Sequence, residues 1–199
     1  MNEKILISIS GKSGAGKSIF SEHLANLLNG ELLNLDKISH LSLQNEEIKS
    51  KLLDIFGNEI FDNENNIIRK KMGAIAFSNQ EKLNKLNSIS QVFMENYIDE
   101  IIKNSQKQFI ILEYALLTKM KYFQQSKFKI LVCADENTRL NRLTKRDNIS
   151  QEYLKKREQN LPNFNNNDFD VVINNNENSE QSLIEIAKNT VTLLQSKIK

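Results

Sequence analysis

Short runs of apolar and β-branched residues recur along the chain, separated by longer stretches in which the apolar positions have helical spacing. Each run is bounded by glycine, asparagine or charged residues, which is typical of buried strands. The runs predict strands over residues 4–10, 31–35, 109–112, 128–133 and 171–173. Strands that alternate with helices form a parallel sheet covered on both faces. The pattern therefore predicts an α/β fold with a five-stranded parallel sheet.

Helical spacing is clearest over residues 19–28, before a stop at Asn29-Gly30. The same spacing predicts helices over residues 136–147, 150–159 and 182–194. Residues 37–103 are also mostly helical in pattern, with a break at Gly57. A helical stretch of this length between two strands indicates an insertion into the sheet domain.

We therefore expect one domain over residues 1–199. Its core comprises residues 1–36 and 105–199. The insertion over about 37–104 is expected to be helical and to bind a substrate.

One motif carries specific chemistry. Residues 11–18 match the pattern G-x-x-x-x-G-K-S in full, between the first predicted strand and the first predicted helix. The motif consists of Gly11, Lys12, Ser13, Gly14, Ala15, Gly16, Lys17 and Ser18. In such a phosphate-binding loop, or P-loop, backbone N–H groups and the helix N-terminus hold phosphates. The alternative is a glycine-rich turn that matches the pattern by chance. Such a turn would not be expected to lie directly between a predicted strand and a predicted helix.

Two side chains of the motif have distinct roles. Lys17 is placed to reach the β- and γ-phosphates, and Ser18 offers a hydroxyl to Mg²⁺. The motif thus predicts a site for ATP and Mg²⁺ in a three-layer P-loop fold. A GTPase would also carry an Asn-Lys-x-Asp segment and a switch Asp-x-x-Gly, and the sequence contains neither.

Two acidic residues follow predicted strands. Asp36 follows the second strand, where ligands bind in parallel sheets, and can take the proton of an acceptor hydroxyl. The alternative is that Asp36 caps the next helix. Glu113 ends the third strand. It is either an acid for Mg²⁺ or its waters, or a strand-end carboxylate without a ligand.

Arginines cluster in the predicted helix over residues 136–147. Arg142 and Arg146 are four residues apart and share a helix face, with Arg139 one turn before Arg142. Two guanidinium groups on one face can hold a transferring phosphate. Beside a P-loop this favours a lid over about 136–162, although a solvated helix surface is the simpler reading.

Composition excludes several classes of protein. The chain has 27 Lys and Arg against 25 Asp and Glu, and this balance argues against a nucleic-acid partner. The single Cys133 excludes an internal disulfide and a cysteine-rich zinc site. The first apolar run is too short for a signal sequence or a membrane span, which needs about 20 residues. We therefore expect a cytoplasmic protein without a membrane partner.

The motifs and their order resemble the dephospho-CoA kinase family over most of the chain. The matching positions are Asp36 with Ile38, Phe56 to Ile60, Arg69, Met72, Phe77, Leu116-Leu117, Arg142, Arg146, Gln159 and Asn175. Four positions depart from the family pattern. Ser88-Ile89 stands in place of His-Pro, Ala115 in place of Pro, Asn34 in place of an acidic residue, and His40 in place of an Arg.

The resemblance implies ATP-dependent phosphorylation of the 3′-hydroxyl of dephospho-CoA. It implies that Asp36, Lys17 and Arg142 are catalytic and that Arg146 and Asn175 belong to the nucleotide site. The four departures fall in the part of the family pattern that concerns the acceptor site, whereas the motifs for phosphate transfer are intact. Two alternatives follow: a nucleoside or nucleotide kinase with another acceptor, and a nucleotide-binding protein without catalysis.

Overall fold

A computed structural model describes residues 3–147, 162–177 and 179–198. The chain forms two compact units. The sheet unit comprises Met1–Asn34 and Asn104–Lys199, and the helical unit comprises Leu35–Lys103. The last part of the lid expected over 136–162, including the helix expected over 150–159, lies outside the described residues.

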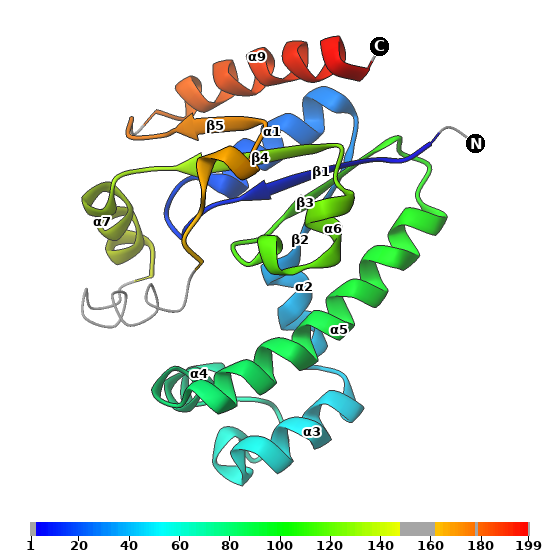
Figure 1. Ribbon diagram of the computed structural model, residues 1–199. Helices are drawn as coiled ribbons and strands as arrows, with labels where there is room; N and C mark the ends of the chain where they lie inside the picture. Colours follow the sequence, from blue (N-terminus) through cyan, green and yellow to red (C-terminus); the bar gives the residue numbers. More distant parts are fainter. Residues whose placement is uncertain (1–2, 148–161, 178, 199) are drawn as a thin grey trace. The chain divides into compact units, whose positions relative to one another are not determined.

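The sheet unit is built on five parallel strands in the order β2-β3-β1-β4-β5 (Figure 1). The strands are β1 (Ile5–Ser10), β2 (Glu31–Asn34), β3 (Phe109–Glu113), β4 (Phe128–Cys133) and β5 (Val171–Asn174). The predicted five-stranded parallel sheet is therefore confirmed. β1 lies at the centre, because Ile7 pairs with Ile111 of β3 on one side and with Phe128 of β4 on the other.

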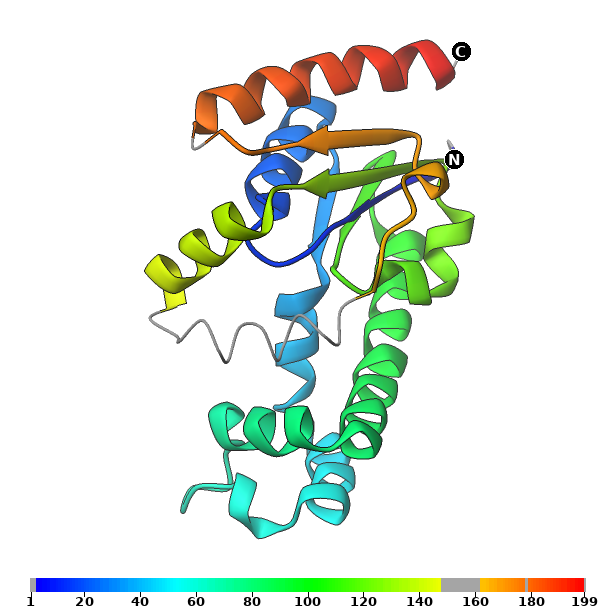
Figure 2. The same ribbon diagram turned by 60° about the vertical axis from the view of Figure 1, so that its left-hand side comes forward.

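Helices cover both faces of this sheet. On one face, α1 (Lys17–Leu28) and α9 (Glu180–Ile198) share a core with the alternate β1 residues Ile7 and Ile9. On the other face, the intervening Ser8 bonds to Ser126 through their hydroxyl oxygens at 2.6 Å. Ser126 directly follows the short helix α6 (Lys121–Gln125), which with the 3₁₀ turn η2 (Leu117–Lys119) packs on β1. Figure 2 shows α9 and α1 together beside the strands.

Two further elements complete the sheet unit. The helix α7 (Glu136–Asp147) follows β4, and the 3₁₀ turn η3 (Asn166–Asp168) precedes β5. No helix among the residues that the structure describes combines the length and apolar character needed to cross a membrane.

The helical unit has its own core. It contains α2 (Leu35–Ser42), α3 (Glu46–Phe56), the 3₁₀ turn η1 (Asn58–Ile60), α4 (Arg69–Ser78) and most of α5 (Gln80–Asn104). Buried Leu52, Phe56 and Met72 belong to one apolar cluster within this unit. Asn45 caps α3, since its side-chain oxygen accepts a hydrogen bond of 3.1 Å from the N–H of Ile48.

Element ends differ slightly from the sequence expectations. β2 ends at Asn34, and α2 already begins at Leu35, whose side chain is fully buried. Asp36 thus lies in the first turn of a helix rather than at the end of a strand, where its carboxylate complements the positive end of the helix dipole. α9 is longer than expected at both ends, because the flanking polar residues contain no Gly or Pro to stop a helix.

Candidate functional site

The P-loop connects β1 to α1 with three glycines at positive φ. Gly14 has φ +79° and Gly16, directly before α1, has φ +96°. A Cβ on Gly14 would lie 2.7 Å from the backbone oxygen of Arg139, and a Cβ on Gly16 would overlap the Asn175 amide. Both the backbone conformation and the lack of space therefore require glycine at these positions.

Three side chains from outside the loop donate hydrogen bonds to its carbonyl oxygens. Arg139 Nη1 donates to Ser13 O at 3.2 Å, and Arg142 Nη1 donates to Gly14 O at 3.2 Å. Asn175 Nδ2 donates to Ala15 O at 2.9 Å. Three successive carbonyls of the loop are thereby bonded to residues more than a hundred positions away in the sequence.

Glu113 lies where two neighbouring strands end beside the P-loop. The β3 residue Glu113 pairs with Asn34 of β2 and with Ile9 of β1, so the carboxyl ends of these strands meet. Its side chain is 1% exposed. The hydroxyl of Ser18 donates to Oε2 at 3.3 Å, and the Asn34 amide donates to the same oxygen.

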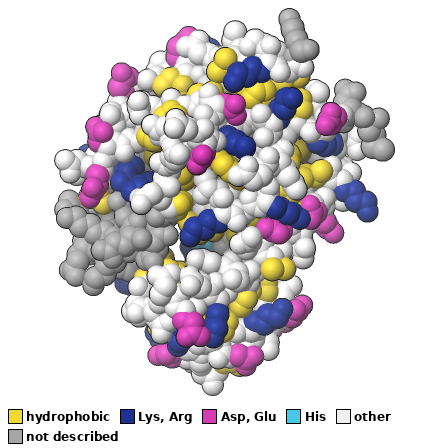
Figure 3. Space-filling view, in the orientation of Figure 1, with side chains coloured by type: hydrophobic (Ala, Val, Ile, Leu, Met, Phe, Trp, Pro, Cys, Tyr) yellow, Lys and Arg dark blue, Asp and Glu magenta, His cyan; other side chains and the backbone are white. Residues whose placement is uncertain are grey.

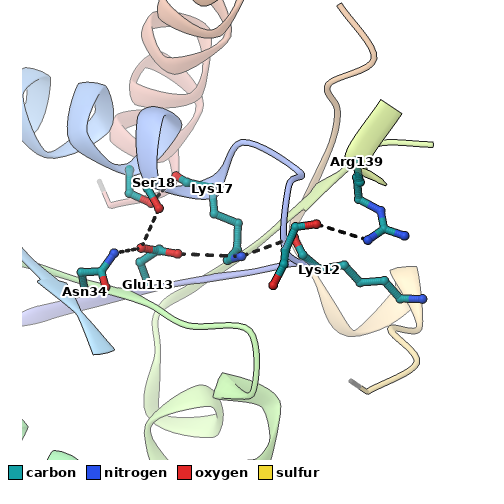
Figure 4. A network of polar contacts seen from close by, with 8 residues as sticks. Lys12, Lys17, Ser18, Asn34, Glu113 and Arg139 are labelled. Carbon is teal, nitrogen blue, oxygen red and sulfur yellow. Dashed lines mark hydrogen bonds and ion pairs between the residues drawn. The ribbon is translucent and has the colours of Figure 1, made fainter. Parts of the chain in front are cut away.

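Lys17 supplies the opposite charge to this buried carboxylate. Its Nζ lies 3.9 Å from Glu113 Oε1 and donates a hydrogen bond of 3.4 Å to Lys12 O (Figure 4). A buried charge is stable only when it is paired and hydrogen-bonded, and Glu113 has both kinds of partner. Glu113 is therefore no free strand-end carboxylate but the centre of a polar network with the two P-loop side chains.

Two of the predicted arginines of α7, Arg139 and Arg142, lie against the P-loop rather than on a solvated helix surface. Arg142 donates to Asn175 O at 3.0 Å and to Glu177 O at 2.7 Å, in addition to the P-loop. Removal from water lowers the pKa of the Arg142 guanidinium below its usual value. Arg139 is 4% exposed and also donates through Nε to Ala134 O at 3.2 Å. Arg146, one turn after Arg142, is exposed.

The predicted site residues fall in both units. The P-loop, Arg142, Arg146 and Asn175 belong to the sheet unit, and exposed Asp36 belongs to the helical unit. Gln159, a residue of the family resemblance, lies outside the described residues.

Sequence reasoning missed the partners that hold the site together. In the sequence, Asn34 stands out only as a departure from a family pattern, and Arg139 only as a member of an arginine cluster. Asn34 meets Glu113 because β2 and β3 are neighbours, and the order of strands in a sheet cannot be derived from a single sequence. The spacing predicts that Arg142 and Arg146 share one helix face, with Arg139 one turn before Arg142, and it gives no sign that Arg139 reaches the P-loop.

The oxygen atoms present fit a magnesium ion. Ser18 Oγ and the Glu113 carboxylate lie together, and Mg²⁺ typically takes one or two protein oxygens and completes its shell with phosphates and water. Among the residues that the structure describes, no cluster of three or more His, Cys, Asp and Glu side chains offers a separate all-protein metal site.

Known proteins resemble this chain in sequence and in structure. The family model for dephospho-CoA kinase matches residues 5–181. A dephospho-CoA kinase of Fusobacterium nucleatum is 32% identical over 178 residues, which cover 88% of this chain and 92% of that protein. The structure of dephospho-CoA kinase from Campylobacter jejuni superposes with a TM-score of 0.63 at 22% identity, covering 98% of both chains.

A crystal structure of a Thermus thermophilus protein superposes with a TM-score of 0.78 at 22% identity, covering 96% of this chain and 98% of that one. At this level of identity the structural likenesses establish the fold, which this chain shares with the dephospho-CoA kinase from Campylobacter jejuni. The sequence match extends from β1 into the start of α9 and includes the whole P-loop. The chain therefore belongs to the dephospho-CoA kinase family.

Proposed function

We propose that the protein transfers the γ-phosphoryl group of ATP to the 3′-hydroxyl of dephospho-CoA, giving coenzyme A and ADP. The observation that carries this proposal is the family match over residues 5–181, in a chain whose P-loop contacts a buried acid. In the reaction the hydroxyl oxygen forms a bond to the γ-phosphorus. The bond from that phosphorus to the β–γ bridging oxygen breaks, and the hydroxyl proton leaves to a base.

The P-loop residues Gly11 to Ser18 bind the triphosphate. Backbone N–H groups at the start of α1 face the phosphates, and Lys17 balances the charge of the β- and γ-phosphates. Ser18 and Glu113 hold Mg²⁺, directly or through its waters. When bound, the ion neutralises charge on the phosphate oxygens and keeps them in position.

Asp36 takes the proton of the acceptor hydroxyl. A carboxylate within reach of that hydroxyl raises its nucleophilicity as the proton leaves. The helical unit, residues 35–103, binds dephospho-CoA. Arg142 and Arg146 belong to a lid that balances the charge that develops on the transferred group, and Asn175 belongs to the nucleotide site.

Use of ATP together with a single cysteine favours a cytoplasmic location.

The test is turnover with purified protein, Mg-ATP and dephospho-CoA, followed by the mass of the product. We expect the acceptor to gain one phosphoryl group and ADP to form in equal amount. Lys17→Met should abolish transfer, and Asp36→Asn should slow turnover with little change in ATP affinity. ATP binding without transfer to dephospho-CoA would refute the proposed reaction.

The same assay separates the alternatives. A panel of nucleosides and nucleotides under identical conditions reveals a kinase with another acceptor. Steady ADP formation that depends on an acceptor refutes a purely nucleotide-binding role. The family's named substrate is expected to be preferred because the match to the family model covers residues 5–181 and so includes the whole helical unit. On the face shown in Figure 3, basic and acidic side chains are interspersed, and the described residues of this face present no continuous basic patch for a nucleic-acid substrate.

A further inference from the structure

We propose that Arg139 and Asn175 are positioning residues that fix the backbone of the P-loop for phosphate binding. Arg139 holds the first of three successive carbonyls, at Ser13, and Asn175 holds the last, at Ala15. Arg142 holds the carbonyl between them, at Gly14. The proposal rests on the proposed function in so far as the loop binds the triphosphate of ATP.

The geometry of the peptide bond links these contacts to the phosphate site. In a planar trans peptide, the C=O of one residue and the N–H of the next point in opposite directions. Fixing the Ser13 carbonyl therefore fixes the N–H of Gly14, and fixing the Ala15 carbonyl fixes the N–H of Gly16. The N–H of Ala15 closes the turn by donating to Lys12 O at 3.2 Å. The side-chain donors thus set the directions of N–H groups on the opposite side of the loop.

Arg139 is suited to this role because its guanidinium joins two segments. Nε donates to Ala134 O, at the junction of β4 and α7, while Nη1 donates to Ser13 O. Both bonds are 3.2 Å long, and the residue is 4% exposed, so water competes little for either carbonyl. A lysine ammonium lacks this planar fork and cannot reproduce the pair of bonds in one geometry.

Asn175 performs the same task without charge. Its backbone N–H donates to Cys133 O at 2.7 Å, which ties it to the end of β4. Its side chain, in a residue that is 4% exposed, donates to Ala15 O. Because Asn175 is neutral, its replacement separates loss of position from loss of positive charge near the phosphates.

The test compares the binding of Mg-ATP, inorganic tripolyphosphate and adenosine by calorimetry. The variants are Arg139→Lys, which keeps the charge, and Asn175→Leu, which keeps the approximate size. Each should weaken the binding of tripolyphosphate and Mg-ATP by about two- to tenfold, the effect of losing one hydrogen bond of ordinary strength. Adenosine, which has no phosphate for the loop to bind, should bind as it does to the wild type.

The control is Lys145→Met, which removes one positive charge from an exposed position on the same helix. It should leave the affinity for tripolyphosphate unchanged. Thermal melting of each variant shows whether it is folded, and a destabilised Asn175→Leu can be replaced by Asn175→Gln, which moves the amide away from Ala15.

Two results would overturn the proposal. One is wild-type affinity for tripolyphosphate in both folded variants. The other is an equal loss of affinity for adenosine and tripolyphosphate, which would indicate general damage to the site. No acceptor is present in these measurements, so their outcome is independent of whether dephospho-CoA is the substrate.

Discussion

At the scale of single residues, the site depends on the ion pair and the hydrogen bonds that a buried carboxyl group makes. Glu113 has a lysine ammonium on one oxygen and two neutral donors, from Ser18 and Asn34, on the other. Charge-assisted hydrogen bonds of this kind are stronger than neutral ones. The contribution of Asn34 can be measured, since its amide is the donor that comes from outside the P-loop.

We predict that Asn34→Leu lowers the free energy of unfolding by about 1–3 kcal/mol, because it removes a donor from a buried carboxylate. Chemical denaturation measures the difference. Asn189→Leu, at an exposed position of α9, is the matched control and should stay within about 0.5 kcal/mol of the wild type. Equal stabilities for the two variants would show that the Asn34 bond adds nothing to the fold.

The pH dependence of Cys133 alkylation reports how far the thiol is removed from water. Burial raises the pKa of its thiol above the usual range, and the positive charge of Arg139 opposes part of this shift. The thiolate is the reactive form, so alkylation by iodoacetamide should be slow near neutral pH and should still be accelerating where an ordinary thiol is fully ionised. Mass spectrometry follows the rate, and the urea-unfolded chain is the control. A folded protein whose rate levels off at the same pH as the unfolded chain would contradict the prediction.

The P-loop could be predicted from the sequence because its residues are consecutive. Spacing alone identified Lys17, Ser18 and the three glycines of the motif. The partners Asn34, Arg139 and Glu113 are distant in sequence, and their contacts depend on strand order and on the path of α7.

At the scale of elements, the strands were predictable to within one or two residues. Each is an apolar run bounded by polar residues, and β4 begins and ends where the pattern places it. The five-residue helix α6 was not predicted, because it is too short for helical spacing to show. The start of α2 was also missed, since Leu35 continues the apolar run of β2 while its backbone is already helical.

The helix α9 offers two adjacent leucines with different surroundings. Leu194 is fully buried in the core that α9 shares with α1 and the sheet, whereas Leu193 is 39% exposed. We predict that Leu194→Ala lowers the free energy of unfolding by about 2–5 kcal/mol, because it leaves a cavity in a packed core. Leu193→Ala is the control in the same denaturation experiment and should cost much less. A reversed order would mean that α9 is packed in another register.

At the scale of the whole molecule, each of the two units has an apolar core of its own. The sheet unit is packed around Ile7 and Ile9 of β1, and the helical unit around Leu52 and Phe56 of α3. Under the proposed function, the sheet unit binds ATP and the helical unit binds dephospho-CoA. Damage to one core should therefore affect one substrate more than the other.

We predict that Leu52→Ala, in the core of the helical unit, raises the KM for dephospho-CoA while the affinity for ATP changes less than about twofold. The reason is that Leu52 is fully buried in the helical unit, whereas the P-loop belongs to the sheet unit. Steady-state kinetics and ATP titration measure the two quantities. The neighbouring Leu53→Ala, at a position that is 39% exposed, should leave both close to wild type. A parallel loss of ATP affinity in Leu52→Ala would argue against separate roles for the two units.

The contacts between the P-loop and its distant partners also bear on how the protein is synthesised. Residues 11–18 are synthesised well before the donors to their carbonyls, which stand at positions 139, 142 and 175. The central strand β1 likewise has no neighbour in the sheet until β3 and β4 have been synthesised. A nascent chain that ends at residue 104 therefore carries the entire phosphate-binding motif without the partners that shape it. Because a ligand stabilises only a state that binds it, ATP should begin to protect this protein from proteolysis only after Asn175 has been synthesised and has left the ribosome.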